Sequence, residues 1–254
     1  AMASRIISCE WIALCRRSGI WAELRSLPNE SHAEGLLLVD SFAEVPREPC
    51  GGIDCLQLPL EAPASSPPGS ASCRIVVLSD THCRHRSITV PPGDLLVVCG
   101  DFTRAGTLDE VADFAAWLEE QPCTHKVVVA GNHDITFDEP YFAARGCKFH
   151  EAKSGSTSDA AAMKELCRQC QELLKSNPKI IYLENELRTV GGLRIWGSPC
   201  QGAFFSDHSM GAFTLPRGKA DSPGSAWMQI PDGVDIVVTH GPPLGIGDMS
   251  GEGG

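Results

Sequence analysis

The sequence predicts an α/β fold with a mainly parallel sheet, and three observations carry this prediction. Short runs rich in β-branched residues recur along the chain between turn residues, which is typical of buried strands; they cover residues 75–78, 95–98, 127–129 and 236–238. A helical pattern lies between the second and third runs, as the crossover between parallel strands requires. Each run is followed by a polar cluster, and α/β sheets place their sites at the carboxyl ends of strands.

Three segments are expected in chain order. Residues 1–60 form an N-terminal appendage of unassigned role, with a helix-like pattern over residues 2–27 and a strand-like run at 35–39. Residues 61–72 are rich in Pro, Ser and Gly, which is the composition of a flexible linker. Residues 73–254 carry all four runs and are expected to form the main domain.

The first helix of the main domain is predicted from its start signal. Thr107 and Glu110 have the spacing of a capping box, and Val111, Phe114 and Leu118 then form an apolar face that ends near residue 120. The later elements are expected in this order: a helix over 158–175 that stops at Asn177-Pro178, a strand at 180–183, a hairpin of 187–190 and 193–196 across Gly191-Gly192, and a strandless loop over 201–213 near the site.

The polar clusters after the four runs together indicate a metal site. Each cluster alone is as consistent with a turn, or with a packed histidine, as with a ligand. As a set they combine two Asp, one Asn and two or three His at strand ends, and these donors suit borderline to hard divalent ions. The clusters are Ser79-Asp80-Thr81-His82, Gly100-Asp101-Phe102-Thr103, Gly131-Asn132-His133-Asp134 and Thr239-His240-Gly241.

The set resembles the calcineurin-like metallophosphoesterases. Their pattern is Asp-Xaa-His, Gly-Asp, Gly-Asn-His followed by Asp or Glu, a further His, and a final Gly-His-Xaa-His. The chain has the first four elements in this order, over about residues 73–248. Further motifs resemble the small metallophosphoesterase-domain-containing branch (MPPED, or 239FB-type): Gly197-Ser198-Pro199, Leu215-Pro216-Arg217-Gly218 and His240-Gly241-Pro242-Pro243-Leu244-Gly245. The resemblance implies a metallophosphoesterase-type β-sandwich, two packed sheets flanked by helices.

The resemblance also implies two divalent ions, of the Mn, Fe, Zn or Mg type. Asp101 is the candidate bridge between them, because it directly follows a strand and holds the bridging place in the family motif. Asp80 and His82 are expected to complete one ion site, and Asn132 and His240 the other. Two such ions activate a water and clamp the oxygens of a phosphate.

His133 is the candidate acid for the leaving alkoxide, since the ordinary pKa of an imidazole, about 6.5, suits proton transfer near neutrality. Asp134 could orient or charge that imidazole, and a carboxylate at a helix N-terminus is an equally good interpretation. The histidines outside the motifs are interpreted as surface or packing residues, with His208 able to touch a substrate: His85, His125, His150 and His208.

The last family motif, Gly-His-Xaa-His, does not follow His240 in this chain, which ends at Gly254. The function is therefore open between a two-metal hydrolase of small phosphodiesters, for example cyclic nucleotides, and a weak or inactive module that binds a phosphate or nucleotide. A third interpretation is a domain truncated at its C-terminus, with uncovered sheet edges that drive self-association.

The charge balance bears on the partners. Lys plus Arg number 21 and Asp plus Glu 32, so the net charge of −11 argues against binding polymeric nucleic acid through its phosphates. A small phosphoester stays compatible, because bound metal ions supply positive charge locally. No apolar run approaches the roughly 20 residues of a membrane span, so no membrane partner is expected.

The 12 cysteines are interpreted as reduced thiols, because some lie within predicted strands and helices and others are scattered without paired spacing, while Cys167-Arg-Gln-Cys170 has no second Cys-Xaa-Xaa-Cys partner. A cytoplasmic protein follows from this interpretation. Organellar targeting by residues 2–27 is the alternative; this segment carries four arginines, but Glu10 and Glu23 weaken the alternative.

Overall fold

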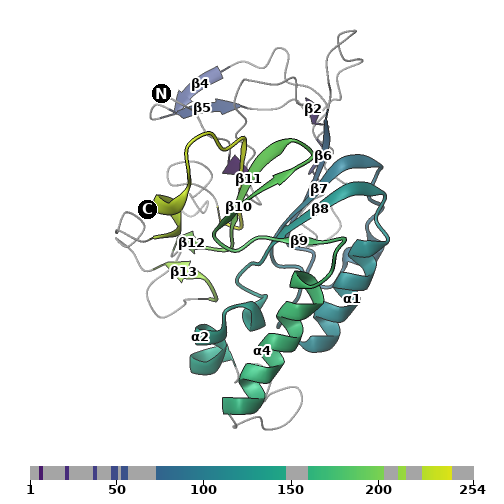
Figure 1. Cartoon of the computed structure of the whole chain (residues 1–254), viewed down its shortest axis with the longest axis vertical. Helices are drawn as coiled ribbons and strands as arrows, with labels where there is room; N and C mark the ends of the chain where they lie inside the picture. Colours follow the sequence, from purple (N-terminus) through teal and green to yellow (C-terminus); the bar gives the residue numbers. More distant parts are fainter. Residues whose placement is uncertain are drawn as a thin grey trace, which may run out of the picture.

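The computed structural model describes residues 73–146, 160–202, 211–215 and 225–241, together with the backbone of five short strands nearer the N-terminus (Figure 1). Those strands are β1 (Ile6–Ile7), β2 (Trp21–Ala22), β3 (Leu37–Leu38), β4 (Arg47–Cys50) and β5 (Ile53–Leu56). The predicted linker at 61–72, His150, His208 and the motif residues 216–218 and 242–245 lie outside the described residues.

The larger sheet contains six strands in the order β2-β6-β7-β8-β9, with β3 also paired to β6. Its four main strands are parallel neighbours: β6 (Arg74–Leu78), β7 (Gly93–Cys99), β8 (Cys123–Val129) and β9 (Ile181–Tyr182). The first three predicted runs and the strand expected at 180–183 are thus confirmed. Because the strands are parallel, the residues that follow them meet at one edge of the sheet.

The smaller sheet has the order β1-β14-β11-β10. The predicted hairpin is confirmed as β10 (Glu186–Val190) and β11 (Leu193–Ser198), which are antiparallel. The fourth predicted run is β14 (Ile236–Thr239), which lies parallel between β11 and β1. This strand therefore has a neighbour on both sides, and self-association through sheet edges stays a prediction.

Two expectations are corrected. The helix-like pattern of residues 2–27 contains two strands instead, β1 and β2, which pair with β14 and β6; of their residues, Ile and Trp are common in strands. The loop over 201–213 begins with β12 (Gln201–Gly202), which pairs in parallel with β13 (Thr214–Leu215). The Gln201 N–H donates to the carbonyl of Phe213 at 3.2 Å, a contact between distant residues that local composition does not signal.

Helix α1 (Leu108–Glu119) begins at the predicted capping box. The Thr107 hydroxyl accepts the Glu110 N–H at 3.3 Å, and the Glu110 carboxylate accepts the Thr107 N–H at 3.0 Å. Helix α4 (Ala160–Lys175) ends where the sequence predicts. In the described part of the chain, no helix combines the length and the apolar character that crossing a membrane requires. Shorter helical segments are η1 (His85–Ser87), η2 (Ile135–Phe137), α2 (Glu139–Tyr141), η3 (Phe142–Gly146) and η4 (Ala226–Gln229).

The larger sheet lies between a layer of helices and the smaller sheet, which explains why its central strands are continuous apolar runs. Helices α1 and α4 cover one face of the larger sheet, and the smaller sheet covers the other (Figure 1). In β6, Val76 belongs to the apolar cluster that includes Phe114 of α1, whereas Ile75 belongs to the cluster that includes Ile236 of β14. Successive strand residues point to opposite faces, so burial on both faces requires every residue to be apolar. The structure confirms the expected α/β fold with two packed sheets flanked by helices.

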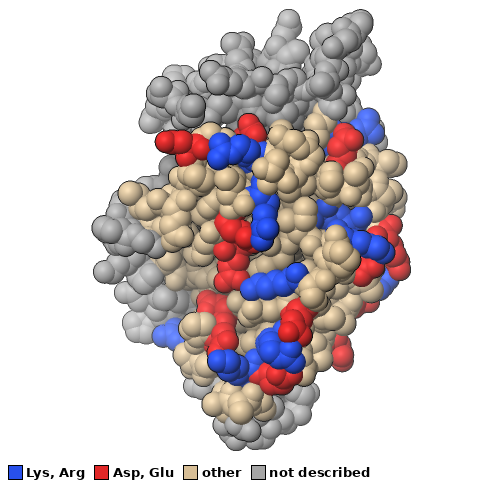
Figure 2. All heavy atoms as spheres, viewed as in Figure 1, with Lys and Arg blue, Asp and Glu red and all other residues tan. Residues whose placement is uncertain are grey.

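On the face shown in Figure 2, basic and acidic side chains are interspersed. Arg168 forms ion pairs with Glu165 and Glu172 along α4, and Lys175 pairs with Glu184. These cations are neutralised by neighbouring carboxylates. They do not gather into a surface that would follow a phosphate backbone.

Candidate metal centre

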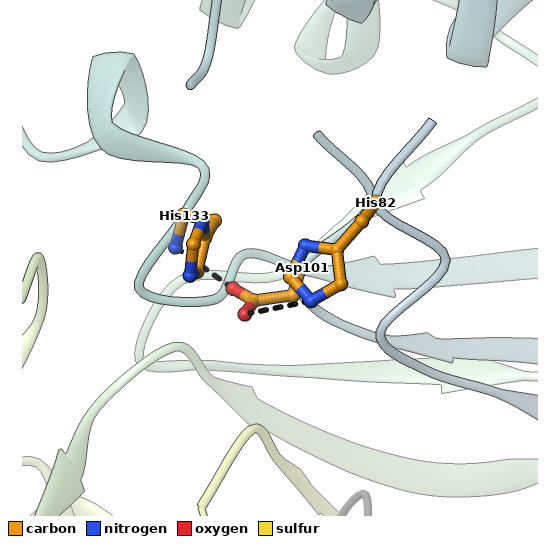
Figure 3. Close-up of side chains that lie close together, drawn as sticks. All are labelled: His82, Asp101 and His133. Atoms are coloured by element: carbon orange, nitrogen blue, oxygen red, sulfur yellow. Dashed lines mark hydrogen bonds and ion pairs between the residues drawn. The ribbon is translucent and has the colours of Figure 1, made fainter. Parts of the chain in front are cut away.

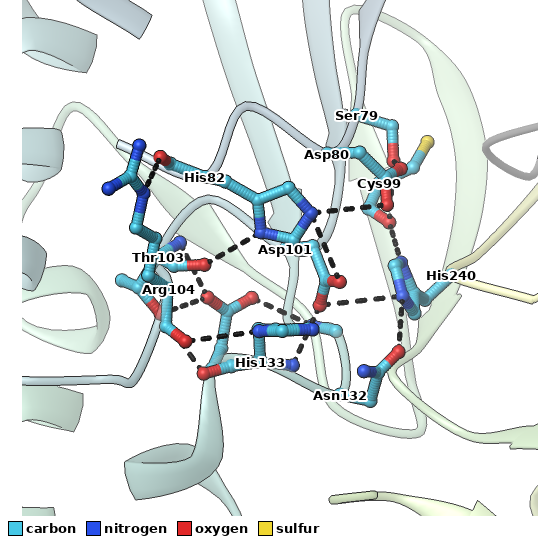
Figure 4. Close-up of polar contacts among 12 residues, drawn as sticks. Ser79, Asp80, His82, Cys99, Asp101, Thr103, Arg104, Asn132, His133 and His240 are labelled. Atoms are coloured by element: carbon cyan, nitrogen blue, oxygen red, sulfur yellow. Dashed lines mark hydrogen bonds and ion pairs between the residues drawn. The ribbon is translucent and has the colours of Figure 1, made fainter. Parts of the chain in front are cut away.

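The predicted ligands meet at the carboxyl ends of the strands (Figure 4). Asp80, Asp101 and Asn132 follow β6, β7 and β8 of the larger sheet, and His240 directly follows β14 of the smaller sheet. Their loops extend the pairing of the sheet: the Asp80 N–H donates to the Gly100 carbonyl at 3.1 Å. The site is thus assembled from strand ends that the sequence places far apart.

The backbone at these strand ends is bent into an uncommon conformation. Asp80, His82 and Asp101 have φ angles of 54°, 41° and 53°, in the left-handed region that residues other than glycine rarely adopt. The His82 N–H donates to the Asp101 carbonyl at 3.0 Å, which helps to hold both bends. Such outliers persist only where the surrounding structure fixes them, and they concentrate at functional sites.

Asp101 is the centre of two groups of possible ligands. His82, Asp101 and His133 form one group, and Asp80, Asp101 and His240 the other; within each group the ligand atoms lie within 4.8 Å of one another. Figure 3 shows the Asp101 carboxylate between His82 and His133. Its Oδ2 lies 3.8 Å from His82 Nε2, and its Oδ1 lies 3.4 Å from His240 Nε2. Asp101 is therefore the residue shared by both groups, and its role as a bridge between two ions stays a prediction.

The placement of Asp80 differs from the expected pairing with His82. Its carboxylate belongs to the His240 group, and it also lies 4.0 Å from His82 Nε2, so it borders both ligand groups. The Ser79 hydroxyl donates to it. Burial raises the pKa of Asp80, and the nearby Asp101 charge adds to that rise against the opposing effects of His240 and Ser79. A cation would relieve this cost of two adjacent carboxylates.

Backbone carbonyls orient the three histidines alike. Nδ1 lies 2.7 Å from the Cys99 carbonyl in His240, 3.2 Å from the Thr103 carbonyl in His82, and 3.0 Å from the Arg104 carbonyl in His133. A carbonyl only accepts, so each Nδ1 carries a proton and donates it. In the neutral ring Nε2 then presents its lone pair to the centre, which is the arrangement that metal-binding histidines use.

The surroundings of His240 Nε2 test whether a cation fits. This atom lies 3.0 Å from the Asn132 side-chain oxygen and 3.4 Å from Asp101 Oδ1, so acceptors face one another. Burial lowers the pKa of His240, but the charges of Asp101 and Asp80 outweigh it and the net pKa is raised. Either a proton on Nε2 or a metal ion resolves this contact. Carboxylate, amide and imidazole donors together suit a divalent ion.

The Asp134 side chain holds neighbouring loops together through buried hydrogen bonds. It is fully buried; its Oδ1 accepts the Thr103 N–H at 2.9 Å and the Thr103 hydroxyl at 2.6 Å, and its Oδ2 accepts the Gly131 N–H at 2.8 Å. Burial and the Asp101 charge raise the pKa of Asp134 to about 7, against these hydrogen bonds. The expectation that Asp134 orients the His133 imidazole is corrected: the Arg104 carbonyl does so, and Asp134 joins the loops that carry Asp101 and His133.

The motif glycines are required by close approach. A Cβ on Gly131 would contact Asp101 Oδ1 and would lie 2.5 Å from the Asp101 backbone nitrogen. A Cβ on Gly100, whose φ is +96°, would lie 2.7 Å from both the Gly131 nitrogen and His240 Nδ1. No side chain fits where these two loops cross, so the Gly-Asp and Gly-Asn-His-Asp clusters are also packing motifs.

Outside the motifs, His85 and His125 lie away from the site, whereas Arg104 borders it. His85 is fully buried against α1, with its Nε2 3.0 Å from Asp113 and its ring beside Trp117, which confirms the packing interpretation. His125 lies beside the hairpin turn at Gly191. The sequence interpretation missed Arg104, whose backbone orients His133. Only its position three residues after Asp101 could have drawn attention to it.

The comparisons with known proteins agree with this geometry. The sequence model of a family described as calcineurin-like phosphoesterase matches residues 73–254. Metallophosphoesterase domain-containing protein 1 of Homo sapiens is 40% identical over 190 residues, 75% of this chain and 54% of that protein, and its Mus musculus counterpart gives the same values. The UPF0046 protein K07C11.7 of Caenorhabditis elegans is 32% identical over 190 residues, 74% of this chain and 58% of that protein. The chain spans about half the length of the curated relatives it matches.

Proposed function

The chain belongs to the calcineurin-like phosphoesterase family, and we propose that it hydrolyses small phosphodiesters, such as cyclic nucleotides, with two divalent ions. One observation carries the proposal: the lone pairs of His82 and His240 Nε2 converge on the buried carboxylate of Asp101. Acceptors turned toward one another in a buried site are unfavourable, and a cation bound between them would relieve that cost.

The chain supplies ligands for both ions. Asp101 would serve both, His82 one, and His240 with the side-chain oxygen of Asn132 the other, while Asp80 borders both groups. Divalent ions of the Mn, Fe, Zn or Mg type would supply an activated water and positive charge for the phosphate oxygens. The protein's part is to hold these donors at fixed strand ends before the ions bind.

His133 is suited to hold the proton that the leaving alkoxide needs. Its Nδ1 is committed to the Arg104 carbonyl, so Nε2 is the atom that can give up a proton at the exposed side of the site. General acid catalysis of this kind is typically worth roughly 10²–10⁴-fold. His133 also belongs to a group of possible metal ligands, and the metal content of a His133 variant distinguishes the two roles.

The test combines metal binding with turnover. The protein is stripped of metal, loaded in turn with manganese, iron, zinc or magnesium, and assayed on bis(4-nitrophenyl) phosphate and on cyclic AMP, with Asp101→Asn as the control for the site. Metal-dependent hydrolysis that Asp101→Asn abolishes is expected. Metal binding without turnover of either ester would instead support a phosphate-binding module, and no binding of any of the four ions would refute both functions.

We also propose that the protein works in the cytoplasm. The described cysteines are free thiols, and burial raises the pKa of Cys170 to about 11 and that of Cys167 to about 12, so both stay protonated and unreactive. Subcellular fractionation tests this proposal, and recovery in an organelle would refute it.

A further inference from the structure

Arg104 lies at the rim of the metal centre, between Asp101 and α1, and is tied to two of its histidines. Its carbonyl oxygen lies 3.0 Å from His133 Nδ1, and its Nε donates to the His82 carbonyl at 3.0 Å. Figure 4 shows the Arg104 side chain beside His82, on the opposite side of Asp101 from His240. The backbone and side chain of Arg104 are therefore both placed by the site.

The outer edge of the Arg104 guanidinium is available to a ligand. The side chain is exposed, and its one hydrogen bond to a described residue uses Nε, so within the described part of the chain the two terminal nitrogens have no partner. A guanidinium offers parallel N–H donors that match a carboxylate or phosphate group. In contrast, the exposed cation Arg188 on β10 is paired with Glu186 at 2.9 Å.

The side on which Arg104 lies indicates which part of a substrate it meets. His133 is the proposed acid for the leaving group, and the Arg104 carbonyl holds its imidazole. His82 and His133 belong to the ligand group that Arg104 contacts, whereas His240 belongs to the other group, so a leaving group at His133 lies on the side of the centre that carries Arg104. A neutral leaving group would leave the terminal nitrogens to water, whereas an anionic one would bind them.

We propose that Arg104 binds an anionic group on the leaving-group side of the substrate, so that the preferred substrates are phosphoesters whose leaving group carries a second carboxylate or phosphate. This inference rests on the proposed function and narrows its substrate class. Arg104 acts by direct contact with the substrate. Because the whole chain has a net charge of −11, an anionic ligand is repelled at long range, and a cation at the site offsets that repulsion locally.

Three chromogenic esters test the proposal: methyl 4-nitrophenyl phosphate, its 3-carboxy derivative and its 3-phosphonate derivative. Each is assayed with the manganese-loaded protein and with Arg104→Gln, Arg104→Lys and the remote charge control Arg188→Gln. Hydrogen bonds to charged groups support an expected loss of about 10-fold or more in kcat/KM for Arg104→Gln on the two anionic esters. Methyl 4-nitrophenyl phosphate, whose leaving group carries no added anion, should lose less than the two esters with an anionic leaving group, and Arg104→Lys should recover part of the loss on those two.

The two anionic esters distinguish a carboxylate from a phosphate as the preferred group. An equal loss of Arg104→Gln on all three esters would refute the proposal, because Arg104 would then act through the His82 backbone. An equal loss from Arg188→Gln would also refute it, as an effect of overall charge.

A binding measurement keeps the test independent of turnover. Calorimetric titration of the manganese-loaded protein compares benzylphosphonate with 3-carboxybenzylphosphonate, neither of which can be hydrolysed at its C–P bond. The proposal is supported if the parent protein binds the carboxylated compound more tightly and Arg104→Gln loses that difference. This holds even if no ester is turned over, because absence of turnover would refute only the proposed hydrolysis. Equal binding of both compounds by the unaltered protein would refute the role of Arg104.

Discussion

Gly131→Ala is expected to disable the metal centre by adding one methyl group. The added Cβ would contact Asp101 Oδ1 and would lie 2.5 Å from the Asp101 backbone nitrogen and 2.8 Å from His240 Cε1. The Asp101 nitrogen belongs to the backbone, and Asp101 Oδ1 is held by the His133 N–H at 2.8 Å, so neither atom can move away easily. Gly202→Ala is the matched control, since a Cβ at that position meets nothing within 4 Å.

The expected magnitude follows from the distances. The new Cβ and the Asp101 nitrogen must separate by about 0.9 Å to reach the ordinary contact distance of 3.4 Å, whereas metal ligands tolerate only about ±0.2 Å. Overpacking of this kind costs roughly 1–3 kcal/mol, which corresponds to a loss of roughly 2–12 °C in the melting temperature of the metal-free protein. Manganese at 100 times its Kd should stabilise the parent protein by about 2.7 kcal/mol, and a 100-fold weaker site by only about 0.4 kcal/mol.

Thermal denaturation of the parent protein, Gly131→Ala and Gly202→Ala, each with and without manganese, measures both effects. Gly202→Ala should match the parent protein in both conditions. The reasoning would be refuted if Gly131→Ala kept the full stabilisation by manganese, because the approach of the two loops would then not determine the position of Asp101.

Three further predictions concern single residues. Asp101→Ala should remove more metal than Asp80→Ala in elemental analysis, because Asp101 is proposed to serve both ions; equal loss of both ions would contradict the bridge. His133→Ala should keep its metal and lose roughly 10²–10⁴-fold in turnover, with a smaller loss on aryl than on alkyl esters; a loss of metal would make His133 a ligand. Burial lowers the pKa of His85, against the opposing effect of Asp113, so the folded protein keeps this ring neutral when the unfolded chain takes up a proton. The neutral His85 ring therefore adds stability above a pH of about 6.5, and this stability is lost as the pH falls below that value. Between pH 7.5 and 5.5, urea titrations should show a smaller loss in the free energy of unfolding for His85→Phe than for the parent protein. Equal losses would contradict this assignment.

The strands and the first helix could be predicted because their signals are local. Burial on both faces makes β6, β7 and β8 continuous apolar runs, and a capping box needs only Thr107 and Glu110, three residues apart. The meeting of Asp80, Asp101 and Asn132, which follow parallel strands of the larger sheet, was predictable for a related reason. Parallel strands bring their carboxyl ends to one edge, so ligand types at those ends indicate the site without knowledge of the loops.

The details that could not be predicted depend on contacts between distant segments. Asp134 stands next to His133 in the sequence, but a tight turn, with the Asp134 N–H 3.1 Å from the Gly131 carbonyl, directs its carboxylate to Thr103. The role of Arg104 likewise depends on how its loop crosses that of His133. The strands β1 and β2 are two residues long, and they exist only through pairing with strands far along the chain.

The origin of the ligands in two different sheets has a mechanical consequence. Asp101 and Asn132 belong to the larger sheet and His240 to the smaller one, and between the layers the contacts are mainly apolar side chains. Such contacts resist separation of the layers but are not directional, so they oppose sliding only weakly. An ion bound by donors from both sheets would cross-link the two layers at one end of this interface. Its removal should lower the shear stiffness of the sandwich and leave each sheet intact.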